Sequence, residues 1–167
     1  MIGLGVGEQH ARAIAAHSRA RVAWLLDLDR GRAEALARTL GQGDIASDYA
    51  AVLADPAVDA VMLASYDDDH AAQVVAALQA GKHVFCEKPL CRTLAEAAAI
   101  GRARGDRHLR CNLVLRAAPL FRWLRDAIRN GELGDVYALD GDYLYGRLHK
   151  ITDGWRGEVD DYSVIQG

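Results

Sequence analysis

Short apolar runs alternate along the chain with amphipathic helical segments, and this alternation constrains the fold more than any other feature. The apolar runs, each of which predicts a strand buried on both faces, cover 22–26, 58–64, 83–86 and 109–114. Between them, apolar residues recur at helical spacing over 33–40 and 71–78, and a glycine follows each segment. The order strand, helix, strand, helix predicts a parallel sheet covered by helices.

Two further local patterns extend this α/β prediction. Thr93 and Glu96 have the spacing of a capping box, which predicts a helix running to about Arg104. A weaker strand signal near 44–46 would bring the sheet to six strands, counting the short apolar start of the chain. We therefore expect a doubly wound parallel sheet over residues 1–117.

The pattern changes after Pro119. Apolar residues between Leu120 and Ile128 predict an amphipathic helix, and we assign 118–133 to a connecting helix. From Val136 to Tyr145 the sequence has a period of two with one more polar face, which suits an open antiparallel sheet. Residues 134–167 are therefore expected to begin a second, α+β domain that the chain does not complete.

Composition excludes several classes of protein. Hydrophobic residues make up 51% of the 167 residues and charged residues 26%, as in an ordinary globular domain. No apolar run is long enough to span a bilayer, and a net charge of −3 gives no basic footprint for nucleic acid. The three cysteines lack metal-ligand spacing, and the start has no signal-peptide pattern. We expect no metal, no membrane or nucleic-acid partner, and reduced thiols in a cytoplasmic protein.

Both ends of the chain suggest a fragment of a longer protein. Only Met1 and Ile2 precede a glycine run that normally ends a strand of about five or six residues. The segment up to Gly167 stops without a closing helix or strand. We therefore expect the 167-residue chain alone to be poorly stable and inactive as an enzyme.

The run Gly3-Leu4-Gly5-Val6-Gly7 has the composition of a phosphate-binding turn. Residues without a Cβ permit a tight turn, and a pyrophosphate can then approach the N–H groups at a helix N-terminus. Asp27 ends the second predicted strand, where a carboxylate can accept hydrogen bonds from ribose hydroxyls. The dinucleotide pattern would place its third glycine at position 8, which is Glu8, and this carboxylate must turn outward to admit phosphates.

Two other interpretations of the glycine run remain. It could be a purely structural turn. The spacing G-x-G-x-G also occurs in methyltransferases that bind S-adenosylmethionine. Those enzymes usually carry an acidic residue two positions before the first glycine, where this chain has Met1. This difference counts against the interpretation of the glycine run as a methyltransferase motif.

A lysine follows the strand at 83–86. Lys88 lies in the sequence Glu87-Lys88-Pro89, and the carboxyl end of a parallel strand borders the ligand crevice of a doubly wound sheet. An ammonium there can polarise a substrate hydroxyl or carbonyl and help to move a proton. The alternative is a structural ion pair between Lys88 and Glu87 on a solvated rim.

Together these residues resemble the glucose–fructose oxidoreductase/inositol dehydrogenase/MocA (Gfo/Idh/MocA) family. The matching landmarks are Gly3-Leu4-Gly5, His10, Asp27, His70 and the string AGKHVFCEKPL at 80–90. Later landmarks that also match are Arg116-x-x-Pro119, Gly131-x-x-Gly134 and Gly154-Trp155-Arg156. One stretch departs from the family pattern, because Ser65-Tyr66-Asp67 stands where members often have Thr-Pro-Asn.

The resemblance implies an NAD(P)-dependent oxidoreductase acting on a sugar, polyol or similar carbinol. It implies a Rossmann domain followed by a domain with an open antiparallel sheet, and Lys88 beside the nicotinamide and substrate. NAD is expected, with NADP an alternative, and the full protein is expected to be a homo-oligomer. The family's histidine and aspartate for proton transfer are expected after Gly167. A non-catalytic dinucleotide-binding module or regulator is the rival hypothesis.

The predicted site residues follow from the motifs and the resemblance together. The predicted catalytic residue is Lys88. Cofactor-binding residues are expected to be Gly3, Leu4, Gly5, Val6, Gly7, Asp27, Ser65, Tyr66, His70, Glu87 and Lys88. Candidate substrate residues are Arg116, Tyr143, Trp155 and Arg156.

Overall fold

The computed structural model describes residues 1–142, 144, 146, 149 and 153. The chain divides into two compact units, Met1–Asn112 and Leu113–Gly167.

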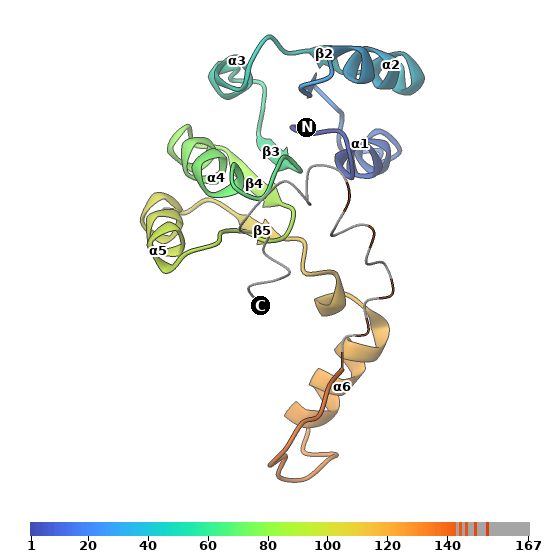
Figure 1. The fold of residues 1–167 in the computed structure, drawn as a ribbon, viewed down its shortest axis with the longest axis vertical. Helices are drawn as coiled ribbons and strands as arrows, with labels where there is room; N and C mark the ends of the chain where they lie inside the picture. Colours follow the sequence, from blue (N-terminus) through green and yellow to red (C-terminus); the bar gives the residue numbers. More distant parts are fainter. Residues whose placement is uncertain (143, 145, 147–148, 150–152, 154–167) are drawn as a thin grey trace. The chain divides into compact units, whose positions relative to one another are not determined.

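The first unit contains the predicted parallel sheet (Figure 1). Its strands are β1 (Trp24–Leu25), β2 (Asp44–Ile45), β3 (Ala60–Leu63), β4 (His83–Cys86) and β5 (Leu109–Cys111). Strand β1 pairs with β2, and β3, β4 and β5 pair in that order. Ile2 joins the two groups because it makes parallel bridges to both Leu26 and Leu63. The start of the chain therefore lies between β1 and β3.

Helices follow the strands in the order that the sequence predicts. They are α1 (Gly7–Ala15), α2 (Arg30–Leu40), α3 (Tyr49–Ala54), α4 (His70–Gln79) and α5 (Leu94–Ala103). The capping box of α5 is confirmed, because Thr93 and Glu96 each accept a hydrogen bond from the other's backbone N–H. Gly41 ends α2 in the left-handed conformation, with φ at 65°. Helix α3 was not predicted; Asp48 caps it by accepting from the N–H of Ala51.

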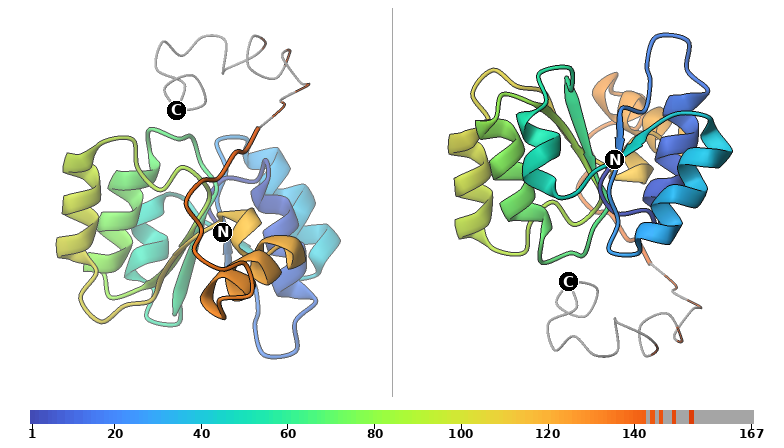
Figure 2. Two further views of the ribbon diagram at one scale, coloured as in Figure 1. Left: turned by 90° about the horizontal axis from the view of Figure 1, so that it is seen from below. Right: turned by 90° about the horizontal axis from the view of Figure 1, so that it is seen from above.

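The helices cover both faces of the sheet, which gives the unit two hydrophobic cores (Figure 2). One core contains Ala11 of α1 and Leu36 of α2, packed with Leu25 of β1. The other contains Val74 of α4 and Ile100 of α5, among residues of β3 and β4. A sheet covered on both faces explains why its strands are apolar runs without alternation.

The second unit departs from the predicted pattern in two places. The strand predicted over 109–114 ends at Cys111, and Val114–Arg116 form a 3₁₀ helix instead. Helix α6 (Pro119–Arg129) is confirmed, with Pro119 at its first turn. The strand predicted over 136–145 is not formed in residues 136–142, because a strand needs a ladder partner. No helix among the described residues is long and apolar enough to cross a membrane.

The tightest constraint on the sheet lies where the chain leaves Ile2. Gly3 has a φ of 76°, and a Cβ at this position would overlap Ala64, lying 2.6 Å from its carbonyl carbon and 2.7 Å from the Ser65 nitrogen. These atoms belong to backbone at the end of β3 and cannot give way cheaply. Gly3 therefore lets the first turn approach the neighbouring strand.

We predict that Gly3→Ala destabilises the chain by about 2–5 kcal/mol, combining left-handed strain with overpacking against Ala64. Gly41→Ala is the matched control, because Gly41 has a similar φ but nothing within 4 Å of the position that a Cβ would take. The control should lose only about 1–2 kcal/mol. Urea unfolding of the two variants measures both values, and equal losses would contradict the close approach.

Candidate functional site

The glycine turn connects Ile2 to the first residue of α1 and leaves backbone groups open to a ligand. Gly5 is exposed and has no atom within 4 Å of the position that a Cβ would take. Val6 caps α1 without any side-chain hydrogen bond to the first helical N–H groups. A helix N-terminus in this state attracts an anion, because no side chain caps its N–H groups and its dipole is positive.

Asp27 lies directly beside this turn. Its Oδ2 accepts from the backbone N–H of Leu4 at 2.6 Å, and its Oδ1 accepts from the N–H of Asp29 at 2.9 Å. The guanidinium of Arg32 lies 3.7 Å from Oδ1. Each carboxylate oxygen can accept more than one hydrogen bond, so Asp27 retains the capacity to bind hydroxyl groups.

The carboxylate of Glu8, which could repel the phosphates of a cofactor, forms an ion pair within α1. Its carboxylate accepts from Nη2 of Arg12 at 2.7 Å, one helical turn further along α1. This pair occupies an exposed part of the helix surface and compensates the charge of Glu8.

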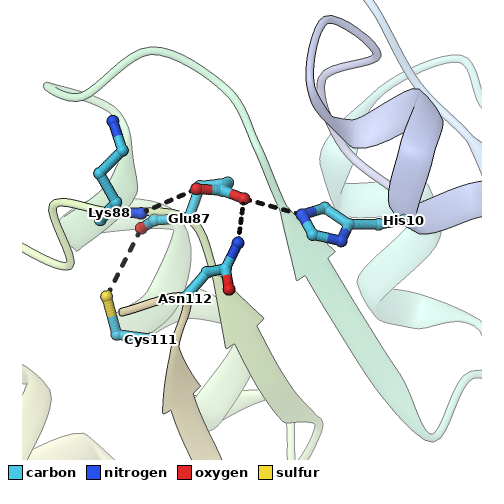
Figure 3. Close-up of polar contacts among 5 residues, drawn as sticks. All are labelled: His10, Glu87, Lys88, Cys111 and Asn112. Carbon is cyan, nitrogen blue, oxygen red and sulfur yellow. Dashed lines mark hydrogen bonds and ion pairs between the residues drawn. The ribbon is translucent and has the colours of Figure 1, made fainter. Parts of the chain in front are cut away.

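Glu87 joins three segments of the first unit at the carboxyl ends of the strands (Figure 3). Its Oε1 accepts from Nδ2 of Asn112 at 2.6 Å and lies 2.8 Å from Nε2 of His10. Because an ionised carboxylate can only accept, His10 carries a proton on Nε2. The ring of His10 also meets Phe85 edge-on, with 5.4 Å between centroids. Helix α1, the end of β4 and the end of β5 are thereby held together.

The charge of Glu87 is stabilised within this network. Burial raises the pKa of its carboxyl, but hydrogen bonds from His10, Asn112 and the backbone N–H of Lys88 outweigh that effect. The resulting pKa lies below the usual value of 4.5. Glu87 is therefore a buried anion near neutral pH.

Lys88 differs from its neighbour in being exposed. Its backbone N–H donates to Oε2 of Glu87 at 3.3 Å, whereas its side chain extends away from that carboxylate (Figure 3). Among the described residues its ammonium forms no ion pair. The alternative of a Lys88–Glu87 side-chain pair is therefore not what the structure shows.

The other predicted cofactor residues lie between the end of β3 and the start of α4. Ser65 donates its hydroxyl hydrogen to Oε1 of Gln73 at 2.6 Å, and Tyr66 is exposed. His70 is only 1% exposed and its Nδ1 lies 2.6 Å from the carbonyl oxygen of Pro89. The imidazole therefore contacts the segment that contains Lys88.

Of the four predicted substrate residues, only Arg116 lies among the described residues. Arg116 lies in the second unit on the 3₁₀ helix, where it is exposed. Tyr143, Trp155 and Arg156 lie outside the described residues. In contrast, the sequence pattern assigns no site role to His10 and Asn112. The position of His10, one helical turn after the glycine run, is the sequence feature that could have indicated a site role for it.

A cavity of about 710 Å³ lies elsewhere in the first unit. Its lining includes Met1, Trp24 and Val58, together with the first residues of β3. This places it at the amino ends of β1 and β3, whereas the glycine turn, Asp27 and Lys88 lie at the carboxyl ends. Ligands of doubly wound sheets bind at the carboxyl ends, so this cavity is not the candidate site.

The donor set fits a dinucleotide and shows no metal centre. The open turn at Gly5 suits a pyrophosphate, and the Asp27 carboxylate suits a ribose. Among the residues that the structure describes, no group of three or more His, Cys, Asp or Glu side chains could hold a metal ion.

Comparison with protein families gives a match over the whole first unit and one residue beyond its end. Residues 1–113 match the Gfo/Idh/MocA model, described as an oxidoreductase family with an NAD-binding Rossmann fold. An inositol 2-dehydrogenase from Acidothermus cellulolyticus is 37% identical over 139 residues, which are 80% of this chain and 41% of the relative. The chain thus spans about two-fifths of the length of that curated relative.

Solved structures give the same result for the fold. A putative myo-inositol dehydrogenase from Sinorhizobium meliloti superposes with a TM-score of 0.71 at 30% identity, covering 80% of this chain and 41% of that one. A scyllo-inositol dehydrogenase from Lactobacillus casei, solved with NAD(H) and scyllo-inositol, gives 0.74 at 24% identity with the same coverage. At that identity the second likeness shows the fold alone.

The Glu87 network predicts a pH-dependent contribution to stability. We expect Glu87→Gln to lower the free energy of unfolding by about 1.5–3 kcal/mol near neutral pH, because hydrogen bonds to a charged acceptor are lost. Because the folded-state pKa of Glu87 is depressed, its stabilisation is complete above 4.5 and is lost as the pH falls through the folded value. The difference between wild type and variant should therefore shrink in acid.

Urea unfolding at neutral and acidic pH measures this difference. Glu34→Gln is the control, because Glu34 forms a largely exposed pair with Arg30 on α2 and should contribute no more than about 1 kcal/mol. An unchanged penalty for Glu87→Gln in acid would show that its charge has no part in the network.

Proposed function

Because the chain belongs to the Gfo/Idh/MocA family of NAD-binding oxidoreductases, we propose that the protein carrying it is an NAD-dependent dehydrogenase of a sugar or polyol. The single observation that supports this most strongly is the environment of Lys88. An exposed ammonium without an ion pair among the described residues follows a buried carboxylate that is tied to the helix after the glycine turn. This arrangement suits a cation that contacts substrate beside a bound cofactor.

The cofactor is proposed to lie along the carboxyl ends of the strands. The N–H groups at Gly5, Val6 and the start of α1 would hold its pyrophosphate, since no side chain caps them. Asp27 would accept from the hydroxyls of the adenosine ribose. Gly3, Leu4 and Gly7 shape the turn, and Ser65 and Tyr66 would border the cofactor at the end of β3.

The chemistry then divides between cofactor and protein. When bound, NAD supplies the hydride acceptor for oxidation of a carbinol. Lys88 is proposed to donate a hydrogen bond to the oxygen of the reacting carbinol, which stabilises the negative charge that develops as a general base takes the hydroxyl proton. The histidine that the family resemblance implies after Gly167 is the proposed base. Glu87 is proposed to hold the backbone of Lys88 in place, since its carboxylate accepts the Lys88 N–H and is anchored by His10 and Asn112.

The substrate class comes from the relatives. The comparison proteins are named as dehydrogenases of inositols, which are cyclic polyols. We propose a polyol or sugar with a secondary hydroxyl as the substrate. Arg116, Tyr143, Trp155 and Arg156 remain its proposed contacts, and a homo-oligomer remains the proposed assembly.

The proposed compartment is the cytoplasm. Cys86 and Cys91 form no disulfide, and Cys86 is buried. Thiols that form no disulfide suit a reducing environment.

We predict that NADH binds more tightly than NADPH, because the Asp27 carboxylate repels a 2′-phosphate. The expected ratio is about tenfold, which corresponds to roughly 1.4 kcal/mol. Arg32, 3.7 Å from Asp27, opposes the effect. Fluorescence titration of both cofactors measures the ratio. Asp27→Asn should reduce this ratio of affinities, whereas the control Asp44→Asn, at an exposed residue of β2, should leave it unchanged. Equal or tighter binding of NADPH by wild type would contradict the proposed role of Asp27.

We also predict that Lys88→Ala lowers kcat by about 10²–10⁴-fold in the protein that carries this chain, the range typical of general acid–base groups. The Kd for NADH should change little, because Lys88 acts on the substrate. Steady-state assays with inositols and sugars, combined with NADH titration, separate the two effects. Near-normal turnover by the variant would remove Lys88 from the chemistry, and wild type that binds NADH without oxidising any polyol would favour a binding module.

A further inference from the structure

His70 is a buried polar side chain that the proposed chemistry does not use. It is the first residue of α4 and is 1% exposed. Its Nδ1 lies 2.6 Å from the carbonyl oxygen of Pro89. A carbonyl can only accept a hydrogen bond, so Nδ1 carries a proton, and in the neutral imidazole Nε2 then presents a lone pair. That Nε2 is buried and has no hydrogen-bond partner among the described residues.

Burying the His70 imidazole at the start of α4 lowers the stability of the folded state. An unpaired buried acceptor disfavours the folded state, whereas an apolar side chain of similar size would leave no polar atom unsatisfied. What the imidazole adds is the bond from Nδ1 to Pro89. The packing of α4 alone therefore does not account for His70.

The Pro89 carbonyl is a specific point of attachment for the segment that bears Lys88. Proline has no backbone N–H, so the carbonyl is the only backbone hydrogen-bonding group that Pro89 offers. On the other side of Lys88, its own N–H bonds to the carboxylate of Glu87 at 3.3 Å. The backbone of Lys88 is thus held from both sides, by Glu87 before it and by His70 through Pro89 after it.

We propose that His70 is a positioning residue, which fixes the direction of the Lys88 side chain through its hydrogen bond to the Pro89 carbonyl. This inference rests on the proposed role of Lys88 in the dehydrogenase. It assigns His70 no contact with substrate and none with the reacting atoms. Its effect on cofactor affinity is accordingly expected to be small.

Two substitutions distinguish positioning from packing. His70→Asn places an amide nitrogen where Nδ1 lies and can still donate to Pro89, whereas His70→Leu fills the space but cannot donate. Positioning predicts that His70→Leu lowers kcat by about 10- to 100-fold, the loss typical of a misplaced catalytic group, with Kd for NADH unchanged. His70→Asn should stay within about threefold of wild type by the same argument. Packing predicts the reverse order, with leucine tolerated and asparagine harmful.

A spectroscopic measurement on the protein that carries this chain tests the inference independently of turnover. Nitrogen-15 NMR of the histidine rings should show a protonated Nδ1 and an unprotonated Nε2 for His70. The side-chain signals of Lys88 should move in His70→Leu and stay near wild type in His70→Asn. An Nε2-protonated ring, unmoved Lys88 signals, or full kcat in His70→Leu would each overturn the inference. If wild type oxidises no polyol while both NMR results hold, the positioning role stands and the proposed function fails.

Discussion

The close approach of Gly3 to the backbone of Ala64 is the contact on which the candidate site depends. Ile2 pairs with strands on both sides, so the chain leaves the middle of the sheet and must turn at once into α1. A side chain at Gly3 would overlap Ala64, at the end of β3. The absence of that side chain lets the turn lie against the sheet, with Leu4 N–H bound to Asp27 and Gly5 left open. The groups proposed to bind phosphate and ribose thereby come from one short segment and its neighbouring strand.

At the same end of the sheet, Glu87 connects the proposed cofactor site to Lys88, the proposed catalytic residue. Its buried carboxylate is held by His10 of α1 and by Asn112 after β5, and it accepts the N–H of Lys88. The helix that begins at the glycine turn is therefore connected through one side chain to the segment that bears the proposed catalytic ammonium. His70 adds a second attachment at Pro89. A buried anion and a buried imidazole both support one exposed lysine.

Much of the first unit could be predicted from sequence because its signals are local. Apolar runs mark the buried strands, and the Thr93–Glu96 box and Gly41 mark helix ends through contacts within one turn. The roles of His10 and Asn112 could not be predicted, because their bonds to Glu87 join residues 77 and 25 positions apart. The strand predicted over 136–145 failed for a related reason. A period of two shows which faces differ, but a ladder partner decides whether a strand forms.

The carboxyl ends of the strands, and not the cavity at their amino ends, are proposed to bind the cofactor. Backbone NMR of the 15N-labelled protein that carries this chain, recorded during titration with NADH, distinguishes the two positions. Binding at the carboxyl ends will shift the amide signals of Gly5, Val6, Asp27 and Lys88 together, and these shifts will saturate with a single Kd. Shifts confined to Trp24, Val58 and their neighbours around the 710 Å³ cavity would contradict it, as would the absence of any saturable shift.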